Sequence, residues 1–301
     1  MPGHERELEE HEEIAPTSDG AKLTLHRIAA HGSRSSFPPV ILTHGTFSNG
    51  KLCRSLGRHL AEQGFESWIV DWRGHGASPA GPAPLDYERL ALAEVDAALG
   101  HVLDSSGREQ VFWIGHSAGG VLPFIYLAHH PAQATRFRGV VALGSQTTHA
   151  GRGLAGKLAL GLGYGLTNLL GRAPGRLFRL GPDDESAPLM NQWFRWNLSG
   201  RWIGRDGFDY LAELAAVDVP LLCFAGGADR FIAPVDGCRR LFDAVGSRDK
   251  EFVHCTRGAG FAVDYTHAGL IAGKQPAAEL WPRIRGWLAS QAERPSAELP
   301  S

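Results

Sequence analysis

The sequence lacks a charge excess of either sign and lacks the residue spacings of a metal site. Its 30 Lys and Arg residues face 32 Asp and Glu residues, and the net charge of −2 gives no electrostatic case for a nucleic-acid partner or an anionic membrane. The four cysteines contain no C-x-x-C pair and stand far apart, at Cys53, Cys223, Cys238 and Cys255. Neither a disulfide framework nor a zinc site is therefore expected. No H-x-x-x-H or H-E-x-x-H spacing occurs, so we predict no metal and no other cofactor.

Long apolar stretches are also scarce. Residues 1–13 are acidic and polar and lack the apolar core of a secretory signal, which favours a cytoplasmic location. Residues 154–170 approach the length of a membrane span, but Lys157, Asn168 and several glycines interrupt them, so no membrane-spanning helix is expected. A chain of 301 residues can form one large α/β domain or two small ones, and the sequence does not indicate an oligomeric state.

One pentapeptide organises the rest of the chain. Gly115-His116-Ser117-Ala118-Gly119 fits the pattern G-x-S-x-G, follows an apolar run at 111–114 and precedes a helical segment at 121–130. A strand, a sharp turn and a helix are the context of a nucleophile elbow, in which a serine stands at the tip of the turn. The two glycines leave space empty where side chains would collide, and the first N–H groups of the helix point to where an oxyanion would form.

Strand-like apolar runs alternate with helical segments along most of the chain. Such alternation predicts an α/β fold with a mainly parallel sheet that helices cover on both faces. After the strand that ends near Gly144 the alternation stops, and it resumes near residue 217; helical fragments are expected between, at 154–170, 189–198 and 208–214. The predicted organisation is a mobile tail at 1–16, an α/β core at 17–145 and 217–292, a helical insertion at 146–216, and a second mobile tail at 293–301.

Functional side chains in such a sheet belong at the carboxyl ends of its strands. Besides Ser117, three candidates fall there: the loop His44-Gly45-Thr46-Phe47, Asp229 after the run 220–228, and His267 in the loop after the last strand. The loop at 44–47 could offer a backbone N–H to an oxyanion. The chain order Ser, Asp, His is that of the triad in α/β-hydrolases.

With these residues in place, the chain resembles the α/β-hydrolase superfamily over about residues 20–291. The matching motifs are His44-Gly45, Asp71-Trp72-Arg73-Gly74-His75-Gly76-Ala77-Ser78, Gly115-His116-Ser117-Ala118-Gly119-Gly120, Gly226-Gly227-Ala228-Asp229 and the loop that carries His267. The stretch 264–274, with the Trp281-Pro282 and Trp287-Leu288 pairs beyond it, is similar to acid-lipase-like hydrolases and to polyhydroxyalkanoate synthases. Those synthases carry Cys at the nucleophile, so Ser117 favours hydrolysis.

The resemblance implies a role for each member of the triad. Ser117 would attack an acyl carbonyl, and His267 would take its proton and later deliver it to the leaving group. Asp229 would fix the imidazole tautomer and stabilise the imidazolium. Asp264 and Asp236 remain alternatives for the acid.

The oxyanion hole implied by the resemblance consists of backbone N–H groups. Ala118, the residue after the nucleophile, and Thr46 would supply them, with Phe47 as the alternative second donor. The histidines next to these loops are expected to support them by hydrogen bonds: His44, His75 and His116.

The segment that interrupts the alternation lies where this fold commonly carries a lid. It holds an aromatic cluster made of Trp193, Phe194, Trp196 and Trp202. An aromatic cap over the strand ends would shape an apolar pocket and exclude water from an acyl intermediate. We therefore expect a lid, and we expect the substrate to contact Phe47, His116, Trp193 and Trp196.

The expected function is hydrolysis of a carboxylic ester, with a small hydrophobic ester or thioester as the partner. A thioesterase or an acyltransferase would use the same triad. Cleavage of an N-terminal residue from a peptide ranks lower, because the predicted lid contains no acidic cluster to hold an α-amino group beyond Asp183-Asp184-Glu185. A catalytically silent binding module on the same fold is the alternative from another class.

Overall fold

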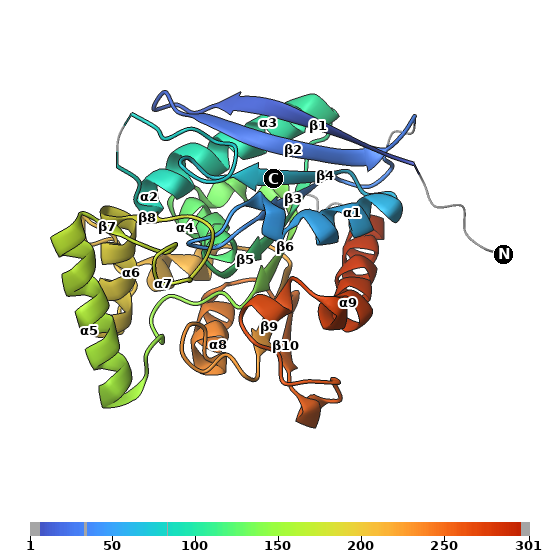
Figure 1. The fold of residues 1–301 in the computed structure, drawn as a ribbon. Helices are drawn as coiled ribbons and strands as arrows, with labels where there is room; N and C mark the ends of the chain where they lie inside the picture. The colour runs from blue at the N-terminus through green and yellow to red at the C-terminus, as the bar shows by residue number, and fades with distance from the viewer. Residues whose placement is uncertain (1–6, 33–34, 83, 296–301) are drawn as a thin grey trace.

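Eight strands form one sheet through the middle of the molecule, with helices on both faces and a separate helical group at one side (Figure 1). This computed structural model describes residues 7–32, 35–82 and 84–295. The strands of the sheet are β1 (Leu8–Pro16), β2 (Lys22–Ala30), β3 (Val40–Thr43), β4 (Ser67–Asp71), β5 (Val111–His116), β6 (Phe137–Leu143), β9 (Leu221–Gly226) and β10 (Lys250–Cys255).

The strand order is β1-β2-β4-β3-β5-β6-β9-β10. From β4 to β10 every neighbouring pair is parallel, and the two antiparallel pairings are those of β2 with β1 and with β4. The predicted α/β fold with a mainly parallel sheet is confirmed. Since parallel strands point the same way, the carboxyl ends of β3, β5, β6, β9 and β10 meet along one edge.

Both faces of the sheet are buried along β3, β4, β5, β6 and β9, as their near-continuous apolar sequences require. In β5, Val111 and Trp113 belong to the core on one face, while Phe112 and Ile114 belong to the core on the other. The first core contains residues of α3 (Asp96–Ser106), α4 (Leu122–His129) and α8 (Val235–Ala244), and the second contains residues of α1 (Arg54–Glu62) and α9 (Lys274–Glu293). The two-residue alternation thus divides the strands between two helical layers.

The sequence predicts a helix from Tyr87 to Leu103 with Asp86 as its cap, and the helix begins there but is not regular. The Asp86 carboxylate accepts a hydrogen bond from the Arg89 N–H at 2.8 Å and so caps the helix. The chain then forms α2 (Tyr87–Arg89), a π-helical turn η2 (Leu90–Val95) and α3. The π turn contains the buried Glu94, which pairs with the equally buried Arg73.

The prediction of a mobile tail over residues 1–16 is wrong for its second half, because β1 forms the edge of the sheet there. Each residue from Leu8 to Pro16 pairs with β2. Its glutamates are held by basic side chains of neighbouring elements: Glu10 by Arg54 and Arg58, and Glu13 by His101. Residues 1–6 lie outside the described residues. At the other end α9 extends to Glu293, and 296–301 also lie outside the described residues.

Between β6 and β9 the chain leaves the sheet and forms the helical group at the side of the molecule in Figure 1. Its elements are α5 (Gly153–Leu170), β7 (Arg172–Ala173), β8 (Glu185–Ser186), α6 (Ala187–Ser199), α7 (Tyr210–Glu213) and the turn η5 (Leu214–Ala216). The three helical fragments predicted here are confirmed. Among the residues that the structure describes, no helix combines the length and apolarity needed to cross a membrane.

Candidate active site

Five segments bring polar groups or close-packed glycines to the carboxyl edge of the sheet. Gly45 follows β3, Ser117 follows β5, Gly144 follows β6 and Asp229 follows β9, while His267 comes from the loop after β10. A Cβ on Gly45 would lie 2.7 Å from the Ser117 Cβ, and one on Gly144 would lie 3.2 Å from the His267 Nδ1. Glycine at these two positions therefore allows the neighbouring loops to close around the serine and the histidine.

Ser117 stands in a strained turn between β5 and the short helix η3 (Ser117–Gly120). Its φ of 54° lies in the left-handed region, which is unfavourable for a residue with a side chain. A Cβ on Gly115 would come within 2.2 Å of the Gly119 backbone, and a Cβ on Gly119 within 2.7 Å of the His44 carbonyl. The elbow can close this tightly because both positions lack a side chain, as the G-x-S-x-G pattern predicts.

Asp229 and His267 are in direct contact. The His267 Nδ1–H donates to the Asp229 Oδ2 at 2.5 Å. The other carboxylate oxygen accepts from the Ile232 and Ala233 N–H groups at 3.2 and 3.0 Å. Burial opposes ionisation of Asp229, but the hydrogen bond from His267 and these two N–H groups hold its pKa below the ordinary value. The contact fixes the tautomer, so Nε2 of His267 is left with its lone pair.

The two alternative acids lie elsewhere. The exposed Asp264 accepts a hydrogen bond from the Arg257 N–H at 2.9 Å, and Asp236 pairs with Arg152. Neither carboxylate contacts His267 in the described part of the chain. Of the three acids considered, Asp229 is the one that the structure places on the imidazole.

His116 connects the serine to the loop of His267. Its Nε2–H donates to the His267 carbonyl at 3.0 Å, and the two ring centroids are 4.6 Å apart. Burial and the neighbouring His267 lower the pKa of His116 to about 3, so the ring is neutral. Within the described residues no hydrogen bond joins the Ser117 hydroxyl to His267. Because His116 is buried and supports the His267 loop, it is a support residue rather than the substrate contact predicted from the sequence.

The backbone N–H groups of the oxyanion-hole candidates differ in their partners. Those of Thr46 and Ala118 make no hydrogen bond to the described part of the chain. The Phe47 N–H, the alternative second donor, donates to the Glu185 Oε1 at 2.8 Å. The Phe47 N–H is therefore already hydrogen-bonded, whereas the N–H groups of Thr46 and Ala118 are free to donate to a ligand.

Comparison with known proteins bears directly on this arrangement. The family described as "alpha/beta hydrolase fold" matches residues 38–163, which include the loop after β3 and the elbow. An esterase from Thermogutta terrifontis has the same fold with a TM-score of 0.65 at 16% identity, covering 94% of this chain and 99% of that one. This chain has the α/β-hydrolase fold.

Two relatives extend the comparison at the level of the sequence. The human lysosomal acid lipase/cholesteryl ester hydrolase is 30% identical over 152 residues, which are 44% of this chain and 38% of that protein. The poly(3-hydroxyalkanoate) polymerase subunit PhaC of Haloferax mediterranei is 22% identical over 295 residues, which are 82% of this chain and 56% of that one. The chain thus spans less than two fifths of the human lipase and little more than half of the polymerase subunit.

A buried ion pair, which sequence reasoning missed, joins the loop after β4 to β8. The His75 Nε2–H donates to the Glu185 Oε1 at 3.1 Å, and its Nδ1–H donates to the Arg73 carbonyl at 3.0 Å. Burial alone would lower the pKa of His75, but the Glu185 carboxylate outweighs it and raises the pKa to about 9. His75 is therefore a cation at neutral pH. The acidic run at 183–185 was the available signal, but its partner lies 110 positions away.

The same carboxylate oxygen holds Phe47 in a left-handed conformation, with φ of 62°. The Phe47 carbonyl accepts from the Asp183 N–H at 3.2 Å, and the Asn49 amide donates to the Asp183 carboxylate at 2.7 Å. A Cβ on Gly181 would lie 1.9 Å from the Phe47 oxygen, and one on Gly175 would lie 2.3 Å from its ring. We call these contacts of 175–185 with Phe47, Asn49 and His75 the latch. The half-buried Phe47 thus packs against the latch, and its contact with substrate stays a prediction.

His44 organises the other side of the same loop. Its Nδ1–H donates to the Gly45 carbonyl at 2.8 Å, and its Nε2 accepts from the Trp72 N–H at 3.3 Å. Burial and the adjacent His75 cation lower the pKa of His44 to about 4, so the ring is neutral. This is the loop-supporting role expected for His44 and His75.

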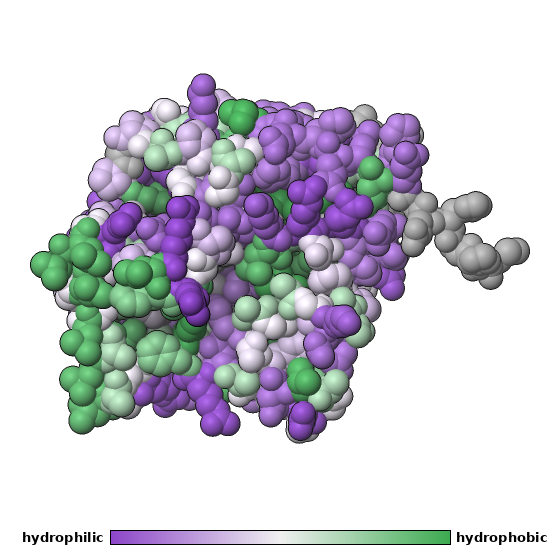
Figure 2. Space-filling model, in the orientation of Figure 1, coloured by the Kyte–Doolittle hydropathy of each residue, from purple (hydrophilic) through white to green (hydrophobic). Residues whose placement is uncertain are grey.

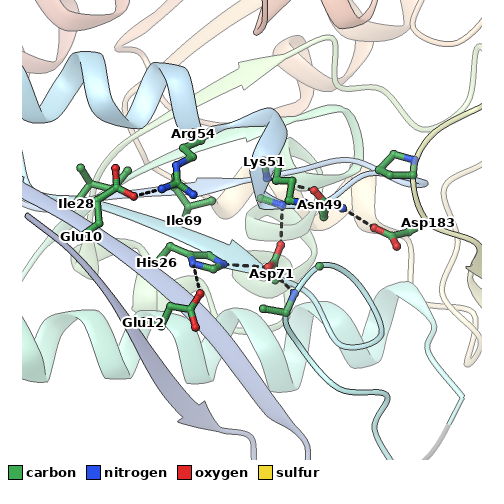
Figure 3. Close-up of a pocket in the computed structure, with 14 residues that line it drawn as sticks. Glu10, Glu12, His26, Ile28, Asn49, Lys51, Arg54, Ile69, Asp71 and Asp183 are labelled. Atoms are coloured by element: carbon green, nitrogen blue, oxygen red, sulfur yellow. Dashed lines mark hydrogen bonds and ion pairs between the residues drawn. The ribbon is translucent and has the colours of Figure 1, made fainter.

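A polar cavity of about 480 Å³ lies beside β1, β2 and β4 (Figure 3), and the latch residues Asn49 and Asp183 form part of its lining. In it the His26 Nε2–H donates to the Asp71 carboxylate at 3.0 Å, and that carboxylate accepts from the Gly50 and Ala77 N–H groups at 2.6 and 2.9 Å. No member of the Ser117, Asp229 and His267 set lines this cavity. Asp71 therefore orders the loops after β3 and β4.

The two tryptophans predicted to contact substrate, Trp193 and Trp196, differ in their burial. Trp196 is almost fully buried, packs against Tyr87 and Trp202, and donates its indole N–H to the Ile203 carbonyl at 2.8 Å. It is a packing residue rather than the substrate contact expected from the sequence. Trp193 is half-buried and packs edge-on against Phe194.

Metal ligands are not gathered anywhere in the part of the chain that the structure describes, since no group of three or more His, Cys, Asp or Glu side chains is placed to hold an ion.

Proposed function

We propose that the protein hydrolyses carboxylic esters through an acyl-enzyme on Ser117. The observation that carries this proposal is the 2.5 Å contact between Asp229 and His267 at the same edge of the sheet as the left-handed Ser117. Similarity to a lipase and to an esterase supports the reaction class. The three side chains come from three separate strand ends, as the triad requires.

In the proposed mechanism His267 moves protons at Nε2. It takes the Ser117 hydroxyl proton as the oxygen attacks the acyl carbonyl, and it gives that proton to the leaving alcohol. Water then attacks the acyl-enzyme while the same nitrogen accepts a proton from it, and Ser117 is regenerated. The low pKa of Asp229 keeps its carboxylate charged, so it stabilises the imidazolium formed in both steps.

We propose Thr46 and Ala118 as the oxyanion donors, because their N–H groups have no partner in the described chain. The latch supports this assignment, since it holds the neighbouring Phe47 in a left-handed conformation and fixes the direction of the loop. Loss of one such donor typically lowers kcat by about 10²- to 10³-fold.

We propose that residues 146–216 act as a lid on an α/β core formed by 17–145 and 217–292. Its attachment through the latch to the loop after β3, next to the candidate oxyanion hole, supports this organisation. The half-buried Trp193 remains the proposed aromatic contact for a hydrophobic acyl group. A cytoplasmic location also stays a prediction, and the four free, buried cysteines fit a reducing compartment.

Transfer of an acyl group from a thioester is the second candidate. The observation that favours it is the similarity to the polymerase subunit, which covers 82% of this chain. Ser117 stands where the synthases carry Cys, and this difference favours hydrolysis. Both reactions would use the same acyl-enzyme.

Two measurements test the proposal. A fluorophosphonate probe should label the protein, and Ser117→Ala should abolish the labelling while the circular-dichroism spectrum stays unchanged. Purified protein should release p-nitrophenol from p-nitrophenyl esters of increasing chain length. A folded wild-type sample that neither reacts with the probe nor hydrolyses any ester would overturn the hydrolase proposal in favour of a binding module, and turnover of acyl-thioesters alone would support the second candidate.

A further inference from the structure

The outer face of α5 exposes a row of leucines to solvent. Leu154, Leu158, Leu162 and Leu169 are 60–81% exposed. Their spacing of four, four and seven residues places them in one stripe along the helix axis. In Figure 2 this stripe forms the apolar band along the left edge of the molecule, where Figure 1 places α5.

The apolar surface continues beyond the helix. Leu177, Phe178 and Leu180, in the turn that follows β7, are each more than half exposed. Of the 12 large apolar side chains that are exposed in the described residues, eight lie between Leu154 and Leu180. We call α5 together with the turn at 177–180 the apolar ridge. A concentration of this kind marks an interaction surface, since scattered exposed leucines are ordinary but a contiguous patch is not.

Folding does not account for the leucines of the ridge. The opposite side of α5 provides its packing through Gly156, Leu160 and Thr167, which are buried. Gly163 lets the ring of Phe194 in α6 approach the helix axis, because a Cβ there would lie 2.9 Å from the ring. The exposed stripe points away from these contacts, so a polar residue in its place would leave the core intact.

Charge around the ridge has one sign in the sequence. Residues 151–182 contain no Asp or Glu and five basic residues: Arg152, Lys157, Arg172, Arg176 and Arg179. Three of them pair with acids outside this segment, Arg152 with Asp236, Arg172 with Asp184, and Arg176 with Asp183. Arg179 and Arg195 of α6 are exposed and form no ion pair within the described residues. The local surplus is positive although the whole chain carries −2.

We propose that the apolar ridge binds the surface of a bilayer that contains anionic phospholipid, with α5 lying in the plane of the headgroups. A helix of 18 residues is about 27 Å long and presents a stripe of leucines flanked by basic side chains, which is the pattern of an interfacial helix. The headgroups of such lipids complement the unpaired arginines. Two copies of the ridge would instead bring like charges together, so charge complementarity favours lipid over self-association.

The test uses full-length protein carrying Ser117→Ala, so that binding is measured without any hydrolysis. Sedimentation with phosphatidylcholine vesicles that contain phosphatidylglycerol should recover the protein in the pellet, and vesicles of phosphatidylcholine alone should recover much less. The triple change Leu154→Ser, Leu158→Ser and Leu162→Ser should weaken binding by about tenfold or more. A matched control, Ile14→Ser with Leu198→Ser, removes exposed apolar side chains elsewhere and should bind as the parent does.

The basic residues have their own variant. Arg179→Gln with Arg195→Gln should reduce the preference for anionic vesicles, and the added salt that weakens parent binding should affect this variant less. Equal binding to both kinds of vesicle, or binding that survives the leucine changes in a variant with an unchanged unfolding midpoint, would overturn the proposal. So would a concentration-dependent dimer without vesicle binding, which would assign the ridge to a second copy. Because the parent carries Ser117→Ala, failure here leaves the proposed esterase activity untouched.

Discussion

The apolar residues of the central sheet strands are buried, whereas many of those in the β6–β9 connection are exposed. In β5 all six residues are buried, and alternation divides the four apolar ones between two cores. In α5 three of 18 residues are buried, and the leucines of the apolar ridge face water. Packing therefore explains the composition of the sheet, whereas the composition of α5 requires a second constraint such as binding. The following predictions break or sharpen this contrast, from the largest expected effect to the smallest.

The largest effect is expected where the sheet presents the nucleophile. Ser117→Ala should lower kcat on a p-nitrophenyl ester by on the order of 10⁵-fold or more, because no other hydroxyl occupies the elbow. Because alanine keeps the Cβ and loses only the hydroxyl, the backbone strain at residue 117 is unchanged and the fold should not be destabilised. Steady-state kinetics and a urea titration of the same preparation measure both quantities, and a loss of activity smaller than about 10²-fold would remove Ser117 from the mechanism.

The second effect concerns Asp229, the proposed acid of the triad, which follows β9. Asp229→Asn should lower kcat by about 10⁴-fold, because an amide would leave the wrong tautomer of His267 facing the serine. Asp264→Asn is the matched control, since that carboxylate accepts from the exposed loop at Arg257 instead. If the Asp264 variant lost as much activity as the Asp229 variant, a rearranged triad would replace the proposed one.

The third effect concerns the ion pair between His75 and Glu185, which joins the sheet to the β6–β9 connection. The pKa of His75 rises from 6.5 when unfolded to about 9 in the folded protein, so its pairing with Glu185 contributes full stability below pH 6.5 and loses it as the pH rises through 9. The difference corresponds to about 3 kcal/mol.

Urea unfolding at pH 6, 8 and 10 should therefore show the free-energy gap between wild type and His75→Gln shrinking as the pH rises. The comparison between the two proteins isolates this pair, because His116 is present in both and burial keeps the His44 ring neutral over this pH range. A gap that does not change with pH would mean that the His75 ring is neutral in the folded protein.

The smallest effect separates the two sides of one helix. Leu158→Ala should change the free energy of unfolding by no more than about 0.5 kcal/mol, because its side chain is 60% exposed. Leu160→Ala, two positions along and 2% exposed, should cost about 2–5 kcal/mol. Similar losses at both positions would show that the ridge is covered in the folded state, for example by a second copy of the chain.

Local patterns predicted most of the sheet and the elbow. The apolar run at 111–114 corresponds to the buried strand β5, and the Asp86 cap and the G-x-S-x-G glycines act as expected. These features depend on contacts within a few residues. The edge strand β1 escaped prediction because its glutamates give it a polar composition, and its partners are Arg54, Arg58 and His101, far along the chain.

Long-range contacts also decided what the sequence could not reveal about the site. Chain order was sufficient to select Asp229 and His267, which the fold brings into contact. It did not reveal that Glu185 pairs with His75, 110 residues away, or that Trp196 packs into the core. The net charge of the chain also did not reveal the positive surplus around the ridge, because acids elsewhere in the chain balance the five basic residues of 151–182.

The latch has a consequence for engineering the protein. At Gly181 even one methyl group would fall 1.9 Å from the Phe47 oxygen, and at Gly175 it would meet the ring of the same residue. In a library that randomises this loop, variants with a side chain at either glycine position would therefore disrupt the packing against Phe47, whatever residues stand between the two positions. Mutagenesis that aims to change the substrate range should keep both glycines and vary Trp193, the proposed acyl contact, instead.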